Sequence, residues 1–222
     1  MSNENRAVVA INQEQALSSA VERLSREFEG VLDRETVERF LRSSYEQLAA
    51  TATVPNYLPV LTEKFARQRL RALAKIDGKA PTGAPTVLFL CVHNAGRSQM
   101  ALGFFQHYAG DRAVAWSGGS EPGTQVNPVA IEVMTEKGID ICGEYPKPWT
   151  EEIVRAADVV VTMGCGDECP YFPGKRYEDW VLEDPAGQGA DEVRPIRDEI
   201  ERRVLALLAE LDIPADARAA SA

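Results

Sequence analysis

The sequence contains no run of about 18 apolar residues, the length that a membrane-spanning helix needs. Its start shows no basic segment followed by an apolar core, so we expect no secretory signal peptide and a cytoplasmic location. Basic residues are in deficit, because 24 lysines and arginines face 34 aspartates and glutamates, which gives a net charge of −10. This balance argues against binding to nucleic acid or to an anionic membrane.

Cysteine and histidine are scarce. The 222 residues hold four cysteines and two histidines: Cys91, Cys142, Cys165, Cys169, His93 and His107. Four cysteines are too few for a disulfide-stapled scaffold of this size, so catalytic or buried roles are expected, and Cys142 is predicted to be buried beside a sheet. A structural zinc site takes four protein ligands, which this small set disfavours. We expect no bound metal.

Residues 1–80 predict an all-α domain, a bundle of three amphipathic helices. Apolar residues recur at helical spacing in three stretches, which are separated by the capping residue Asp33 and by the helix breaker Pro55. This region holds 12 basic and 11 acidic residues, a net charge of +1, and neither cysteine nor histidine. It therefore cannot carry redox or metal chemistry by itself.

Residues 81–222 predict an α/β domain, which follows a linker rich in proline and glycine at residues 77–85. Apolar runs typical of buried strands lie at residues 86–92, 113–117 and 158–163, and a short strand is predicted near Trp180–Leu182. Helical patterns alternate with these strands. The alternation predicts a parallel four-stranded sheet with helices on both faces.

The loop between the first strand and first helix of this domain is the candidate active site. It reads Cys91, Val92, His93, Asn94, Ala95, Gly96, Arg97 and Ser98. Ligands of such sheets bind at the carboxyl ends of strands, where this loop lies. Asparagine and glycine permit a turn that brings backbone N–H groups inward, and the following helix directs its positive end to the same place. The loop therefore predicts a tetrahedral oxyanion site, with Arg97 as a planar donor.

The same positive field favours the thiolate form of Cys91, and Ser98 can donate a further hydrogen bond to the sulfur. Cys91 is thus predicted to be a nucleophile held against a bound anion. A buried cysteine near a surface arginine is the simpler interpretation. The position of the loop, directly after an apolar strand and directly before a helix, argues against it.

Residues Cys91–Met100, with Asp184-Pro185 downstream, resemble the low-molecular-weight protein tyrosine phosphatases and their arsenate reductase branch. The resemblance covers about residues 85–212 and continues in Gly138–Ile141 and Arg197–Ile200. It implies the phosphatase-like fold and an enzyme that reduces arsenate to arsenite.

The resemblance also implies roles for matching residues. Cys91 would attack arsenic, Asn94 would hold the shape of the loop and Arg97 would bind the oxyanion. Ser98 would support the thiolate, and Asp184 would protonate the departing oxygen, a step that is slow without a proton donor. A turn-capping role for Asp184 is the simpler alternative.

A reductase must also deliver two electrons, and Cys165 and Cys169 follow the predicted strand at residues 158–163. The resemblance implies that Cys165 attacks Cys91 and releases arsenite, and that Cys169 then forms a disulfide with Cys165 for reduction by thioredoxin. No bound cofactor is needed, only an external thiol reductant.

Several alternatives stay open. Only three residues separate Cys165 from Cys169, a shorter spacing than thioredoxin-coupled relatives show, so mycothiol with mycoredoxin could serve as the reductant instead. A phosphatase, or an oxyanion-binding module without catalysis, are the other candidates. For the helical bundle, formation of a homodimer, docking of thioredoxin and stabilisation of the catalytic domain are all compatible with the sequence.

Overall fold

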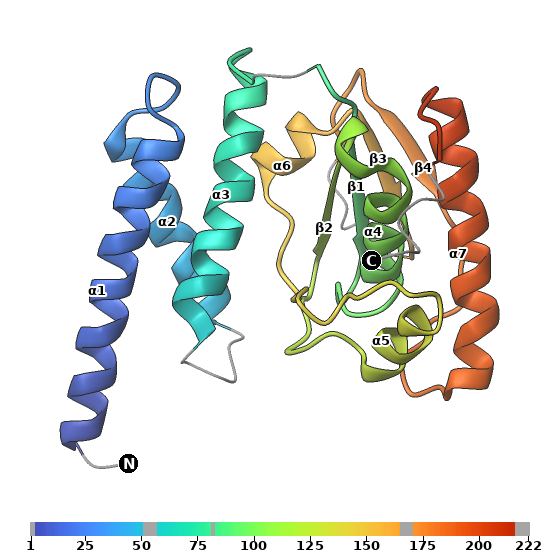
Figure 1. Cartoon of the computed structure of the whole chain (residues 1–222), viewed down its shortest axis with the longest axis horizontal. Coiled ribbons are helices and arrows are strands. Elements are labelled where there is room, and N and C mark those ends of the chain that lie inside the picture. The colour runs from blue at the N-terminus through green and yellow to red at the C-terminus, as the bar shows by residue number, and fades with distance from the viewer. Residues whose placement is uncertain (1–2, 51–56, 81–82, 165–170, 216–222) are drawn as a thin grey trace. The chain divides into compact units, whose positions relative to one another are not determined.

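The computed structural model describes residues 3–50, 57–80, 83–164 and 171–215. The chain divides into two compact units, Met1–Pro81 and Thr82–Ala222 (Figure 1). The first unit contains α1 (Asn3–Glu27), α2 (Arg34–Ala49) and α3 (Leu58–Ile76). The second contains, in order, β1 (Thr86–Cys91), α4 (Arg97–Ala109), η2 (Gly110–Arg112), β2 (Val114–Gly119), α5 (Pro128–Thr135), α6 (Glu151–Ala156), β3 (Val159–Thr162), β4 (Arg176–Asp179) and α7 (Ala190–Glu210). Within the described ranges, no helix is both long and apolar enough to cross a membrane.

The three predicted helices of the first unit are confirmed. Asp33 caps α2, because its carboxylate accepts a hydrogen bond from the backbone N–H of Thr36 at 2.7 Å. The core of the bundle is apolar, and its fully buried members include Leu24, Val37 and Leu70. The helical spacing of apolar residues in the sequence therefore marks the faces along which these helices pack.

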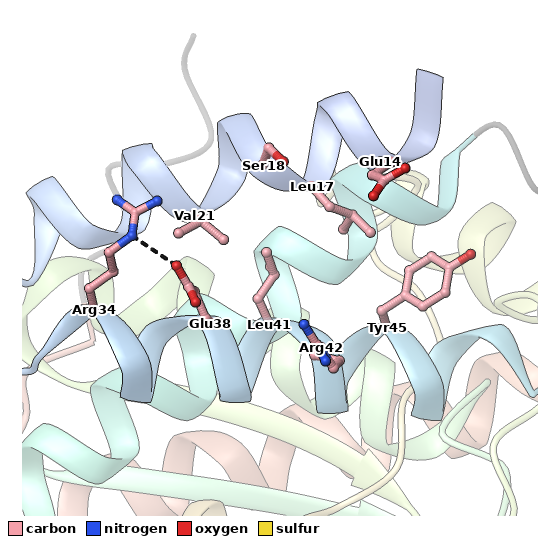
Figure 2. Close-up of a pocket in the computed structure, with 9 residues that line it drawn as sticks. All are labelled: Glu14, Leu17, Ser18, Val21, Arg34, Glu38, Leu41, Arg42 and Tyr45. Carbon is pink, nitrogen blue, oxygen red and sulfur yellow. Dashed lines mark hydrogen bonds and ion pairs between the residues drawn. The ribbon is translucent and has the colours of Figure 1, made fainter. Parts of the chain in front are cut away.

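A pocket of about 350 Å³ lies between α1 and α2. Figure 2 shows Leu17 and Val21 of α1 pointing toward Leu41 of α2, with the ion pair between Arg34 and Glu38 at one end. The residues that line the pocket include no cysteine and no histidine. The chemistry expected of the chain must therefore come from the second unit.

The second unit is built on a sheet with the strand order β2-β1-β3-β4, in which all neighbours are parallel. Every residue of β1 is buried, as predicted for a central parallel strand. Val87, Phe89 and Cys91 face a core that includes residues of α4, α5 and α7. Leu88 and Leu90 alternate to the opposite face, and α6 also contacts β1. The predicted α/β class, four parallel strands with helices on both faces, is confirmed.

The carboxyl ends of three strands meet at one edge of this sheet. Cys91 ends β1 opposite Gly119, which ends β2. The N–H of Met163, directly after β3, donates to the carbonyl of Leu90 at 2.8 Å. The loop that begins at Cys91 therefore lies between the segments that follow β2 and β3.

Two details differ from the expectations. The last strand spans Arg176–Asp179 and not the residues near Trp180–Leu182. It is an edge strand without a fully buried residue, so apolar content could not mark it, whereas the apolar Trp180 belongs to the core after the strand. Cys142 is exposed and not buried, and a hydrogen bond with Asp140 raises the pKa of its thiol.

Candidate active site

The loop after β1 begins with a buried sulfur and ends at the first residue of a helix. Cys91 is 3% exposed, and Arg97 opens α4. Asn94 has a φ of 46°, in the left-handed region that asparagine tolerates better than most residues. This left-handed residue turns the chain between strand and helix.

The carbonyl groups of the loop are hydrogen-bonded to neighbouring segments. The bonds from the segment after β2 are Glu121 N to Val92 O at 2.9 Å, Gly123 N to His93 O at 2.9 Å and Asn127 N to Ala95 O at 2.8 Å. Gln99 Nε2 donates to the carbonyl of Asn94 at 3.0 Å. The described residues contain no cis peptide bond, and in a trans peptide the N–H points opposite to the preceding carbonyl. The N–H groups of residues 93–96 therefore point away from these segments, as an anion-binding loop requires.

A chain of hydrogen bonds leads from Asn94 to the sulfur of Cys91. Asn94 Nδ2 donates to Ser98 Oγ at 2.8 Å, and Ser98 Oγ lies 3.0 Å from Cys91 Sγ. Because the Ser98 oxygen already accepts from Asn94, its own proton is available to the sulfur. A hydroxyl that donates to sulfur favours the thiolate over the thiol.

Two residues outside the predicted set hold Asn94 in place. Gln99 Nε2 donates to Asn94 Oδ1 at 3.2 Å and to the carbonyl of Tyr145 at 3.1 Å. The backbone N–H of Lys147 donates to Asn94 Oδ1 at 3.0 Å. Both ends of the Asn94 amide are thus fixed, with its oxygen toward Lys147 and its nitrogen toward Ser98.

Arg97 is paired with Asp184 across the mouth of the loop. Its Nη2 lies 2.8 Å from Asp184 Oδ2, and its Nη1 donates to the carbonyl of Leu182 at 3.5 Å. The side chain of Arg97 is 8% exposed and that of Asp184 is 50% exposed. Asp184 Oδ1 also accepts from the N–H of Ala186 at 3.0 Å. The acid therefore lies within reach of both the arginine and solvent.

These groups surround a pocket of about 40 Å³, roughly three times the 10–15 Å³ that a cavity needs to hold one water. It has room for a small tetrahedral anion. Its lining residues are Cys91, His93, Ala95, Gly96, Arg97, Asn127, Asp184, Pro185 and Ala186. The structure thus places Cys91, His93, Ala95, Gly96 and Arg97 of the loop around one pocket with Asp184, and it adds Asn127, which was not among the predicted site residues.

Two glycines permit the close approach of segments at this site. A Cβ on Gly96 would lie 2.7 Å from Pro185 Cγ, and a Cβ on Gly119 would lie 2.5 Å from the carbonyl oxygen of Val92. The second clash is with backbone, which cannot swing aside as a flexible side chain can. Gly119 at the end of β2 is therefore needed for the loop to lie where it does.

The segment that leads to the predicted redox cysteines touches the arginine. Gly164 has a φ of 75°, and a Cβ on it would lie 3.0 Å from Arg97 Nη1. Cys165 and Cys169 lie outside the described residues. Gly164, the residue directly before Cys165, lies close to the guanidinium of Arg97.

His93 is exposed, and its Nδ1 lies 3.0 Å from the carbonyl oxygen of Glu121. Among the residues that the structure describes, no group of three or more histidine, cysteine, aspartate or glutamate side chains could hold a metal ion.

Comparison with known proteins identifies the family. Residues 86–216 match the family described as Low molecular weight phosphotyrosine protein phosphatase. Residues 17–74 match the Protein-tyrosine-phosphatase-like, N-terminal domain. The first match alone spans more than half of the chain. The chain therefore belongs to the low molecular weight phosphotyrosine protein phosphatase family, with an N-terminal helical extension.

Arsenate reductases are prominent among the similar proteins, which confirms the resemblance noted in the sequence. A solved thioredoxin-dependent arsenate reductase of Corynebacterium glutamicum is 42% identical with a TM-score of 0.80, and the match covers 88% of this chain and 96% of that one. A putative arsenate reductase of Halobacterium salinarum is 37% identical over 129 residues, 56% of this chain and 91% of its own. A glutaredoxin arsenate reductase of Synechocystis is 38% identical over 128 residues, 56% of this chain and 97% of its own.

Proposed function

We propose that this chain reduces arsenate to arsenite, with Cys91 as the nucleophile. The observation that carries the proposal is the arrangement around its sulfur: Ser98 Oγ at 3.0 Å, with Arg97 and Asp184 lining the same small pocket. The arsenate reductases among the relatives support arsenic as the reacting centre.

The first step joins sulfur to arsenic. The Cys91 thiolate attacks the arsenic of bound arsenate, and a hydroxyl leaves as water after it takes a proton from Asp184. The guanidinium of Arg97 and the N–H groups of residues 93–96 stabilise the charge on the remaining oxygens. Asp184 lies 2.8 Å from Arg97 and is half-exposed, so solvent can return the proton to it.

The second step transfers two electrons to arsenic. The thiolate of Cys165 attacks Cys91 Sγ, the sulfur–arsenic bond breaks, and its electron pair stays on arsenic, which leaves as arsenite. Cys169 then attacks Cys165 and frees Cys91 as a thiolate. The contact between Gly164 and Arg97 supports this role, because it starts the segment beside the pocket.

Thioredoxin is the proposed reductant of the Cys165–Cys169 disulfide. The support is the thioredoxin-dependent relative, whose match extends over most of this chain. Mycothiol with mycoredoxin is the alternative, in which a small thiol attacks the Cys91 adduct directly and the two cysteines are not needed. Both donors imply a reducing compartment, so a cytoplasmic location is part of the proposal.

A phosphatase is the second candidate, because the oxyanion loop and the acid suit a phosphate ester as well as arsenate. The arsenate reductases among the relatives favour arsenate, above all the one whose match extends over most of this chain.

The test is arsenate-dependent NADPH oxidation with a thioredoxin system and, separately, with a mycothiol system. Cys91→Ser is expected to abolish turnover with both, whereas Cys169→Ser abolishes it with thioredoxin alone. Cys142→Ser is the matched control, because this exposed thiol lies outside the pocket lining. Hydrolysis of para-nitrophenyl phosphate that far exceeds arsenate reduction would contradict the proposal in favour of the phosphatase.

A further inference from the structure

One buried cation of the second unit has no part in the chemistry proposed above. Lys147 is 2% exposed and does not line the pocket. Lysine is almost never fully buried unless it is paired, because its ammonium loses hydration. Because an apolar side chain in place of a buried charged one is often neutral or stabilising, burial of this ammonium suggests a role beyond filling space.

The ammonium of Lys147 contacts β2 and the residues that directly precede Lys147. Its Nζ donates to Ser117 Oγ of β2 at 3.1 Å and to the carbonyl of Tyr145 at 3.4 Å. It also lies 3.8 Å from the Glu144 carboxylate and 4.8 Å from the centre of the Tyr145 ring. These contacts tie residues 144–147 to β2, an edge strand of the sheet.

The hydrogen bonds of Lys147 form a network with the loop. The Tyr145 carbonyl that accepts from Lys147 Nζ also accepts from Gln99 Nε2 at 3.1 Å. Gln99 Nε2 donates to Asn94 Oδ1 at 3.2 Å, and this oxygen accepts the backbone N–H of Lys147 at 3.0 Å. Both the side chain and the backbone of Lys147 therefore act on the same asparagine.

This hydrogen-bond network extends to the sulfur of Cys91. Asn94 Nδ2 donates to Ser98 Oγ, and Ser98 Oγ lies 3.0 Å from Cys91 Sγ. If the Asn94 amide shifts, Ser98 loses the donor that directs its own proton to the sulfur. The left-handed turn at Asn94, which sets the direction of the loop N–H groups, shifts with it.

We propose that Lys147 is a positioning residue for arsenate reduction: its buried ammonium fixes Asn94 and thereby holds the Cys91 thiolate and the oxyanion loop ready for reaction. The proposal rests on the proposed function for its substrate. A charged donor suits this task, because its hydrogen bonds are stronger than those of neutral groups and less easily displaced. Removal of the charge is expected to loosen the loop without removing any group that touches the anion.

The experiment compares Lys147→Met with Lys137→Met in the full-length chain. Lys137 is a matched control, since it is an ion-paired lysine of the same unit whose partners are Glu201 and Asp198. Labelling of Cys91 by iodoacetamide is followed across pH by mass spectrometry, with and without inorganic phosphate. The charged and titratable groups that line the Cys91 pocket, His93, Arg97 and Asp184, are unchanged in both variants.

For Lys147→Met, we expect the midpoint of Cys91 labelling to move to higher pH and phosphate protection to weaken. We also expect kcat/KM for arsenate to fall about 10- to 100-fold, the usual effect of misplacing reacting groups by about 1 Å. Lys137→Met should leave all three unchanged. Ser117→Ala, which removes one acceptor and keeps the lysine, should move them in the same direction by less, and it decides the question if Lys147→Met does not fold.

The proposal is overturned if folded Lys147→Met, or Ser117→Ala in its place, loses thermal stability but keeps the wild-type labelling profile and kcat/KM. Labelling and phosphate protection do not depend on arsenate turnover. A shifted profile in a chain that does not reduce arsenate would therefore remove the proposed function and leave the role of Lys147 intact.

Discussion

The two units of the chain both bury a cation, and the partners of that cation differ. In the helical bundle, Arg69 is 7% exposed, donates to the hydroxyls of Ser43 and Ser44 at 3.1 Å, and lies over the rings of Phe40 and Phe65. These partners belong to α2 and α3, so the guanidinium joins two helices. Nothing among these contacts can react.

In the second unit, Arg97 is paired with the candidate acid Asp184. Lys147 donates to Asn94 of the loop through its backbone N–H and to the Tyr145 carbonyl through its ammonium. Arg197 is a third buried cation of that unit, and it binds Val133 and Glu136 in the manner of Arg69. Burial of charge alone therefore does not identify a functional residue. A functional residue is identified by the groups that its charge holds in place.

The largest expected effect comes from Arg97→Lys. Lysine keeps the charge but cannot present a planar pair of donors to two oxygens. We expect kcat/KM for arsenate to fall about 1,000-fold, as loss of a preorganised oxyanion donor does. Steady-state reduction and phosphate protection of Cys91 measure the effect. A fall of less than tenfold would mean that Arg97 serves structure, as Arg69 does.

Gly119→Ala is expected to have the next largest effect. The new Cβ would meet the carbonyl oxygen of Val92 at 2.5 Å and the backbone nitrogen of Asn94 at 3.0 Å, so the loop must move. We expect a loss of about 10- to 100-fold in kcat/KM. Gly143→Ala is the control, because a Cβ there would have no neighbour within 4 Å. Equal activity of the two variants would show that the loop adapts.

Arg69→Ala tests the expectation that the buried cation of the helical bundle serves stability and not catalysis. It removes the hydrogen bonds to Ser43 and Ser44 and the packing on two rings, at a cost of about 2–3 kcal/mol in the free energy of unfolding. Turnover per folded molecule should stay within about twofold of wild type, since neither Arg69 nor these partners line the pocket at Cys91. Urea unfolding and steady-state assays measure both quantities, and size-exclusion chromatography tests whether the chain forms the homodimer that the sequence leaves open. A larger loss of turnover would tie the bundle to catalysis.

The smallest effect is expected from Glu136→Gln. The hydrogen bond from Arg194, aided by one from Arg197, lowers the pKa of Glu136 from 4.5 to about 2. A lowered folded-state pKa adds stability that is present above the unfolded value and is lost as the pH falls through the folded value. The wild type should therefore melt above the variant near neutral pH, and this difference should vanish as the pH approaches about 2. Thermal melts over this range measure it. A difference that is independent of pH would show that packing, and not charge, is the cause.

The sequence alone predicted the parts that follow from local pattern. Periodic apolar residues predicted the bundle, buried runs predicted the central strands, and the strand–loop–helix context predicted the anion loop. Edge strand β4 was misplaced, because a half-exposed strand has no apolar signature. Cys142 was expected in the core because free cysteine is commonly buried, but it lies in an exposed turn.

The supporting residues of the site were missed for a different reason. Gln99 directly follows the loop, but its role depends on Tyr145 and Lys147, which come from a distant segment. Such a hydrogen-bond network arises from tertiary packing and leaves no local pattern in the sequence. Gln99 is fully buried in the first turn of α4, where it follows the buried polar residues Arg97 and Ser98.

The hydrogen bonds that hold the loop carbonyls also limit how well the enzyme can choose between anions. Each carbonyl from Val92 to Ala95 is anchored, so the ring of N–H groups has a set diameter. Phosphate and arsenate have the same shape and nearly the same size, so a stiff ring admits both. Selectivity must then arise after binding, from the readiness of arsenic to bond to sulfur and accept electrons. Abundant phosphate would act as a standing competitor, and resistance to arsenate would depend on the ratio of the two anions in the cell.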